Sequence, residues 1–255
     1  AGVACDMDMI MELAEAHNLF VIEDAAQAID SYYTSKSGKR YPLGSIGHLA
    51  TFSFHETKNI SSGEGGLLAI NDEQFVSRAE IIWEKGTNRA SFFRGEINKY
   101  GWVDIGSSFL PSEITAAFLW AQLEHVAEIQ HRRVQIWNQY DSNFKGKLDS
   151  YGIKTPTIPS YAENNGHMYY LVARDEVQRD YILKRIKESE ILAVFHYLSL
   201  HKSEFFHECH DGRELPFADL FSQRLIRLPF YMELTLAQVD HISQTLLDIV
   251  SEYEH

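Results

Sequence analysis

Apolar and polar positions along this chain predict helices and short buried strands in alternation. The first half is predicted to form a helix over residues 6–18, strands over 19–22, 48–54 and 67–70, and a helix over 73–85. The first helix ends at Asn18, and the third strand closes at the turn residues Asn71 and Asp72. This order predicts an open α/β sheet covered on both faces.

The second half of the chain repeats the alternation on a smaller scale. Residues 86–111 lack periodicity but carry several aromatic side chains, among them Phe92, Phe93, Tyr100 and Trp102, as a functional or interfacial loop would. The later elements are predicted as a long helix over 112–147, a linker over 151–166, strands over 168–173 and 191–195, and helices over 175–189 and 235–253. We therefore expect a larger domain over 1–111, a connecting helix over 112–150 and a small α/β domain over 151–255.

Composition and charge narrow the class of protein. The chain has 255 residues, 45% of them apolar, and a formal charge of −13, which disfavours binding to nucleic acid. No run approaches the roughly 18 apolar residues of a membrane span, and the first residues do not resemble a secretory leader. Two cysteines, Cys5 and Cys209, cannot build a disulfide framework. We expect a cytoplasmic protein that binds neither membranes nor nucleic acid.

Candidate chemistry gathers where predicted strands end. Asp24 follows the first strand, Ser53 ends the second, and Lys58 comes five residues later, before the glycine-rich run SSGEGG. Ligands of open α/β sheets bind outside the carboxyl ends of the strands. The run is not a phosphate-binding Walker motif, because no Gly-Lys-Ser/Thr follows it.

These three residue types fit the demands of pyridoxal phosphate (PLP). A lysine amine must form an imine with the cofactor aldehyde, a carboxylate must keep the pyridine nitrogen protonated, and hydroxyls must bind the phosphate. Each residue alone has an ordinary interpretation: an aspartate after a strand caps a turn, and a loop lysine is solvated. The spacing leaves both interpretations open.

The surrounding motifs resemble a known family. EDAAQ, FSFHETKN and GEGG, with the longer segments EKGTNRASFFRGEINKY, DIGSS and AVFHYLSLH, are similar to the DegT/DnrJ/EryC1/StrS sugar aminotransferases. The resemblance covers nearly the whole chain. It implies the PLP-dependent transferase fold type I (aspartate-aminotransferase-like), with residues 1–111 as the C-terminal portion of the large PLP-binding domain.

The resemblance also implies roles for individual residues. Asp24 would pair with the pyridine nitrogen, and Gln27 would approach the phenolic oxygen of the ring. Ser53 would bind the phosphate, and Lys58 would hold the cofactor covalently. His55 would shape the pocket or simply pack beside the cofactor.

The chain departs from the family pattern in three places. It begins where the family's proteins are about a third of the way along, so a glycine–serine/threonine phosphate loop and a ring-stacking aromatic would lie upstream. Ser108 stands where many members have an asparagine that reaches the partner subunit's cofactor phosphate. Residues 31–42 are longer than in similar members, which is expected to affect substrate choice.

The resemblance implies transfer of an amino group from glutamate to a dTDP-4-keto-6-deoxyhexose, in surface-polysaccharide biosynthesis and with a galacto product. Amination at C3, a gluco product, or a truncated non-catalytic homologue are the alternatives. Some members are dehydratases with a histidine in place of the lysine, and Lys58 argues against that activity. Fold type I sites lie at a dimer interface, so we expect a homodimer.

Six histidine and cysteine positions remain. His167, His196 and His201 are candidates to line the sugar-nucleotide pocket, although packing or surface placement would explain them equally. The cluster of His207, Cys209 and His210 fits no standard zinc spacing, so we expect no metal site.

Overall fold

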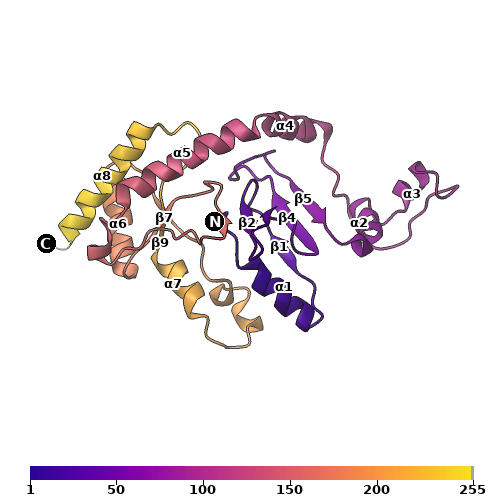
Figure 1. Ribbon diagram of the computed structural model, residues 1–255, viewed down its shortest axis with the longest axis horizontal. Helices are drawn as coiled ribbons and strands as arrows, with labels where there is room; N and C mark the ends of the chain where they lie inside the picture. The colour runs from indigo at the N-terminus through magenta and orange to yellow at the C-terminus, as the bar shows by residue number, and fades with distance from the viewer. Residues whose placement is uncertain (254–255) are drawn as a thin grey trace. The chain divides into compact units, whose positions relative to one another are not determined.

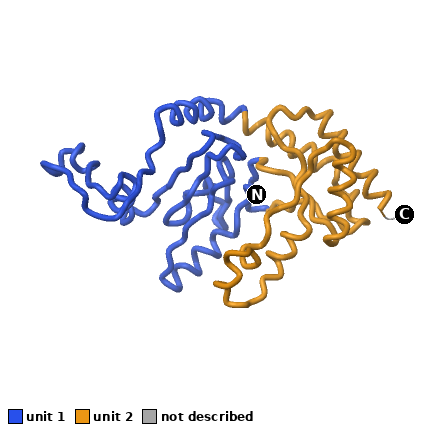
Figure 2. The backbone as a smooth tube through the Cα atoms, turned by 180° about the vertical axis from the view of Figure 1, so that it is seen from behind, with its two compact units in different colours: residues 1–128, 160–165 blue, residues 129–159, 166–255 orange. Residues whose placement is uncertain are grey.

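The computed structural model describes residues 1–253, and Figure 1 shows its helices and strands along the chain. The backbone forms two compact units (Figure 2): residues 1–128 with 160–165, and residues 129–159 with 166–255. The first unit therefore includes a short return segment from a distant part of the sequence.

A sheet of three strands carries the predicted site in the first unit. Its order is β1 (Ile22–Asp24), β4 (Leu49–Ser53) and β5 (Gly66–Ile70). β1 runs parallel to β4, with Asp24 opposite Thr51, whereas β5 is antiparallel to β4. Because β1 and β4 are parallel, Asp24 and Ser53 lie at the same edge of the sheet, each as the last residue of its strand.

The predicted strands over 48–54 and 67–70 are confirmed, but the strand over 19–22 is wrong. Pairing begins only at Ile22 and continues through Glu23 and Asp24. Leu19 and Phe20 come before the strand, with exposed fractions of 59% and 60%. The apolar character of these two residues therefore does not indicate a buried strand. The strand is formed by the residues that follow, including Glu23 and Asp24, which pair with β4.

A second small sheet was not predicted. It joins β2 (Tyr32–Thr34), β3 (Arg40–Pro42) and β6 (Ala162–Glu163), all antiparallel. The long segment 31–42 thus forms a hairpin. Arg40 ties it to the return segment through an ion pair with Glu163 at 2.7 Å, and this hydrogen-bonded pairing lowers the pKa of the Glu163 carboxyl.

The helices of the first unit begin at polar caps. α1 (Met7–Ala16) starts where the Asp6 carboxylate accepts a hydrogen bond from the Met9 amide, and α4 (Glu113–Glu124) starts at Ser112. Between them lie the 3-10 turn Glu73–Phe75, α2 (Val76–Trp83) and α3 (Arg89–Phe93). α2 is shorter than the predicted helix over 73–85, and α3 occupies part of the loop predicted over 86–111.

The long helix predicted over 112–147 is two helices. α4 ends at Glu124, and α5 (Val126–Phe144) begins after a break at His125, whose backbone leaves the helical conformation. The break was not predicted because the helical pattern of the sequence is continuous there, and neither glycine nor proline lies near His125.

The second unit is a three-stranded antiparallel sheet with helices. Its elements are α5, the 3-10 turn Asp149–Tyr151, β7 (Tyr170–Val172), α6 (Glu176–Glu188), β8 (Val194–Phe195), the 3-10 turns Leu200–Lys202 and His207–Cys209, α7 (Pro216–Arg224), β9 (Leu225–Arg227) and α8 (Leu236–Tyr253). The expected β–α–β arrangement is split, because β9 lies between β7 and β8. Its core includes the fully buried rings of Tyr140, Phe144 and Tyr169, which stack on one another.

Candidate active site

A cavity of about 560 Å³ brings together three of the predicted site residues. Asp24, Gln27 and Lys58 all line it, with the segment before α1 and Leu43 completing the wall. Its volume lies within the range of roughly 300–1,000 Å³ typical of small-molecule sites. The end of β1 and the loop after β4 thus converge on one space that can hold a cofactor.

Asp24 lines this cavity together with the preceding carboxylate, and the two accept different numbers of hydrogen bonds. Its neighbour Glu23 accepts hydrogen bonds from the backbone amides of Gly44, Ile46 and Gly47 at 2.7–2.8 Å. Asp24 instead accepts one local bond, from the Ala26 amide at 3.1 Å. Its second carboxylate oxygen has no hydrogen-bond partner among the described residues and can accept a proton donor in the cavity.

Lys58 is held by its chain neighbours rather than by a charge partner. Its amide donates to the His55 carbonyl at 2.9 Å, and the next two residues, Asn59 and Ile60, are buried. In the part of the chain that the structure describes, no carboxylate lies within 4 Å of the Lys58 ammonium group. The amine is therefore available to a ligand in the cavity.

Asn165 connects the two loops that carry these residues. Its side-chain amide donates to the carbonyls of Gln27 and Ile29 at 2.8 and 2.7 Å, and its own carbonyl accepts from Asn59 at 3.1 Å. The return segment therefore fixes the loop after β1 relative to the loop of Lys58. Residues 151–166 were predicted to be a linker, and this role of Asn165 was not predicted because no local motif marks the residue.

Ser53, His55 and Ser108 lie elsewhere in the first unit. Ser53 ends β4, and its hydroxyl accepts from the His55 amide at 3.3 Å. The His55 ring is 2.9 Å from the Thr57 hydroxyl and 3.6 Å from the Glu64 carboxylate. Ser108 forms a β-bridge with Glu84. Of these three residues, none is among the described residues that line the 560 Å³ cavity.

The three predicted substrate histidines belong to the second unit. His167 is buried, and its carbonyl accepts from Arg133 at 2.7 Å. His201 lies 3.2 Å from Asp219, and a hydrogen bond from Lys202 lowers the pKa of that aspartate. His196 is half-buried, and burial together with the charge of Arg227 lowers its pKa below the usual 6.5.

Among the described residues, no group of three or more histidine, cysteine, aspartate or glutamate side chains could hold a metal ion. Nor does any helix in the described range have the length and apolar character needed to cross a membrane.

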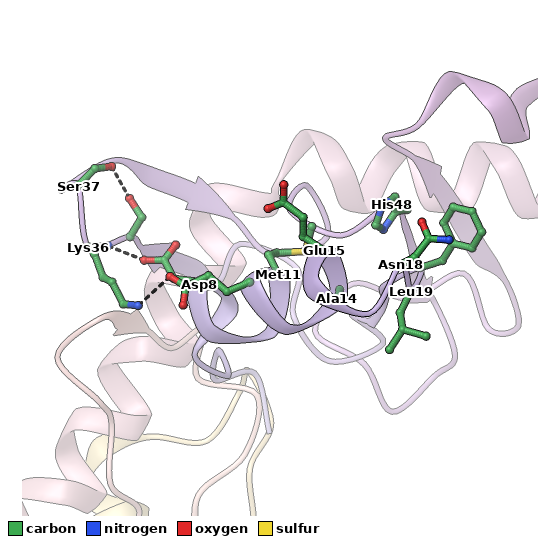
Figure 3. A pocket seen from close by; sticks show the side chains of 12 residues that line it. Asp8, Met11, Ala14, Glu15, Asn18, Leu19, Lys36, Ser37 and His48 are labelled. Atoms are coloured by element: carbon green, nitrogen blue, oxygen red, sulfur yellow. Dashed lines mark hydrogen bonds and ion pairs between the residues drawn. The ribbon is translucent and has the colours of Figure 1, made fainter.

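A larger cavity, of about 700 Å³, lies beside α1 and contains none of the predicted site residues (Figure 3). The β2–β3 hairpin closes one side of it: the Lys36 amide donates to Asp8 at 2.6 Å, and its ammonium pairs with Glu12 at 3.1 Å. Lys36, the one lysine among the described residues that line this larger cavity, is already paired with Glu12. We therefore assign the candidate site to the smaller cavity, where an amine and a carboxylate are both available.

Comparison with known proteins gives relatives over almost the whole chain. This chain is 30% identical over 260 residues to the uncharacterized protein MJ1066 of Methanocaldococcus jannaschii, and the match covers 99% of this chain and 65% of that protein. It is 29% identical to the spore coat polysaccharide biosynthesis protein SpsC of Bacillus subtilis, covering 98% and 64%. The chain thus spans slightly less than two thirds of the length of these relatives.

Solved structures agree on the fold. Helicobacter pylori PseC, an aminotransferase involved in the biosynthesis of pseudoaminic acid, is similar with a TM-score of 0.84 at 23% identity, over 98% of this chain and 64% of that one. DesV of S. venezuelae, solved in complex with a ketimine intermediate, is similar with a TM-score of 0.82 at 26% identity, over 97% of this chain and 62% of that one. The fold is that of the type I PLP-dependent transferases. A family model matches residues 1–247, and the chain belongs to the DegT/DnrJ/EryC1/StrS aminotransferase family.

Proposed function

We propose that this chain carries the Lys58 site of a PLP-dependent aminotransferase that acts on nucleotide-linked keto-sugars. The observation that carries the proposal is the convergence of Asp24, Gln27 and Lys58 on one cavity at the end of β1. A carboxylate, an amide and an amine without a charge partner form the donor set that PLP requires.

PLP, when bound, supplies an aldehyde that condenses with amines and a ring that accepts the electrons of a carbanion. Asp24 would hold a proton on the pyridine nitrogen through its unpartnered carboxylate oxygen. Gln27 would donate to the phenolic oxygen. Ser53 is not among the described residues that line the cavity, but it ends β4 at the same edge of the sheet as Asp24, and we propose that it binds the phosphate there. The Lys58 amine would hold the cofactor, and after displacement by an amino donor its Nζ would take the α-proton and return it.

The proposed substrates are glutamate as amino donor and a dTDP-4-keto-6-deoxyhexose as acceptor. The similarity to a spore coat polysaccharide protein and to an aminotransferase of pseudoaminic acid synthesis supports a role in surface-polysaccharide biosynthesis. The hairpin of residues 31–42 lies in the same unit as the cavity and is the segment most suited to change acceptor choice. His167, His196 and His201 remain candidates for contacts with the sugar nucleotide.

The test is amino transfer by the intact protein. Incubation with PLP, glutamate and a dTDP-4-keto-6-deoxyhexose is expected to give the 4-amino sugar with galacto configuration, identified by NMR. A 3-amino or gluco product would correct the position or epimer but keep the reaction. Absence of any glutamate-dependent amino sugar, with each keto-sugar supplied in turn, would contradict the proposed activity and favour a non-catalytic homologue.

We also propose that the protein is a cytoplasmic homodimer. The apolar helix α4, exposed in this chain, supports pairing with a second copy. Cys5 and Cys209 are both free thiols, as is usual in a reducing compartment.

A further inference from the structure

Arg227 is a half-buried cation without a carboxylate partner in the second unit. Its Nε atom is buried and has no hydrogen-bond partner among the described residues, and no described carboxylate lies within ion-pairing distance of it. The Nε atoms of Arg179 and Arg185 on α6 also lack a hydrogen-bond partner among the described residues. Each of these two arginines nevertheless has a carboxylate partner, Arg179 with Glu176 at 2.9 Å and Arg185 with Glu252 at 2.7 Å, and Arg227 has none. A half-buried charge without a partner is costly, so an anion from outside the chain would stabilise it.

The sheet holds Arg227 in a fixed position. It is the last residue of β9, the central strand, opposite Tyr170 on β7 and Val194 on β8. The next residue inward, Ile226, belongs to the buried core under the helices. Because side chains alternate along a strand, Arg227 lies on the face of the sheet opposite that core.

Two side chains that follow β8 lie beside this guanidinium. The Tyr197 ring centroid is 5.8 Å from Arg227 Cζ, and the Tyr197 side chain is 77% exposed. His196 precedes it, and its Nδ1 atom is buried with no hydrogen-bond partner in the described range. The His196 and Tyr197 rings are 5.6 Å apart. One guanidinium nitrogen, Nε of Arg227, and one imidazole nitrogen, Nδ1 of His196, therefore lack hydrogen-bond partners among the described residues.

We propose that Arg227, His196 and Tyr197 form an oxyanion-binding subsite on the β7–β9–β8 sheet. A guanidinium binds planar or tetrahedral oxyanions through two parallel N–H groups. A neutral His196 with its proton on Nδ1 would add a third donor, since burial and the nearby Arg227 charge lower its pKa. The exposed Tyr197 ring would cover the apolar part of the same ligand.

The proposed function supplies two sources for the oxyanion: the diphosphate of a sugar nucleotide, or a carboxylate of the amino donor. The identity of the oxyanion rests on the proposed function. The binding of an anion at Arg227 does not, because it requires neither the cofactor nor Lys58. The two sources are separated by using inorganic pyrophosphate and glutamate as independent probes.

The experiment is calorimetric titration of the intact protein with each probe. Arg227→Gln is expected to weaken binding of one probe at least about tenfold, and Arg227→Lys about threefold, because lysine keeps the charge but loses the fork. Arg185→Gln is the matched control, since Arg185 already has carboxylate partners, and it is expected to bind as the parent does. Circular dichroism checks that each variant is folded.

A loss confined to pyrophosphate supports the diphosphate source, and a loss confined to glutamate supports the carboxylate source. Equal affinities in parent and Arg227→Gln, equal losses in Arg185→Gln, or no binding by the parent would overturn the subsite. If Arg227→Gln does not fold, the parent and Arg227→Lys decide by the same criterion. Intact pyrophosphate binding without amino transfer would defeat the proposed activity alone.

Discussion

Consecutive carboxylates at the end of β1 have different surroundings and therefore different tasks. Glu23 accepts three backbone amides of the loop before β4 and so supports the strand edge. Asp24 accepts only the Ala26 amide and lines the cavity with Lys58. Glu23 lines the same cavity, so its three hydrogen bonds are what distinguish it from Asp24.

At the same scale, the charge of Arg227 is predicted to control the titration of His196. Burial and the Arg227 charge both lower the His196 pKa below 6.5. Arg227→Gln removes a positive charge beside the imidazole, so the pKa of His196 is expected to rise toward 6.5. NMR titration of the His196 ring proton would measure it, and an unchanged or lower pKa in the variant would contradict the contact.

The same shift sets the sign of a stability effect. The folded state holds His196 neutral below 6.5, where the unfolded chain already binds a proton. The His196 contribution to the free energy of unfolding therefore falls as the pH drops from about 6.5 through the lowered pKa. His196→Gln should lose less stability over that window than the parent does.

Among the structural elements, the return segment 160–165 determines the geometry of the cavity. It contributes β6 to the hairpin sheet, and Asn165 connects the loop after β1 to the loop of Lys58. These partners are more than a hundred residues apart in the sequence. The position of Lys58 relative to Asp24 therefore depends on a segment outside the sheet that carries both.

Asn165→Ala is predicted to weaken cofactor retention as well as stability. The substitution removes the two hydrogen bonds that the side chain donates to part-buried carbonyls, which should lower the free energy of unfolding by about 2 kcal/mol. The affinity for PLP is expected to fall about tenfold, as measured by equilibrium dialysis in which PLP is quantified by its absorbance. Asn143→Ala, which breaks bonds to Asp240 and Ser243 in the second unit, is the control. Equal PLP affinities in the two variants would refute the linking role.

Features that depend on neighbouring residues could be predicted from the sequence, whereas features that depend on contacts between distant residues could not. The strands over 48–54 and 67–70 and the ends at Asp24 and Ser53 were predictable, because apolar runs and polar ends are local signals. The three-residue strands β2 and β3 are too short to show periodicity. The role of Asn165 depends on hydrogen bonds to residues far away in the sequence, and no local pattern shows them. The role proposed for Arg227 depends on the lack of a carboxylate partner in the folded structure, which the sequence does not show either.

On the scale of the whole molecule, helix α4 presents a group of exposed apolar side chains. Ile114, Phe118 and Trp120 are 85%, 54% and 65% exposed, and none of the α4 side chains is buried. A helix that is apolar on all sides is normally covered. A second copy of the chain is the proposed cover, as the dimeric account of the site requires.

Trp120→Glu is accordingly expected to weaken the dimer at least about tenfold, because an aromatic anchor is replaced by a charge. Sedimentation velocity of the intact protein would show the parent as a dimer and the variant shifted to monomer. Val177→Glu, at an exposed position on α6, is the control and should remain dimeric. A dimer unaffected by Trp120→Glu would place the interface elsewhere, and a monomeric parent would contradict the homodimer itself.

The most direct test of the central claim is to locate the covalent attachment of PLP. The intact protein would be incubated with PLP, reduced with borohydride and digested, and the modified peptide identified by mass spectrometry. We expect a pyridoxyl group on Lys58 alone. It should be absent from Lys58→Ala and unchanged in Lys39→Ala, because Lys39 lies on the β2–β3 hairpin and does not line the cavity. Modification of another lysine, or of none, would contradict the assignment of Lys58.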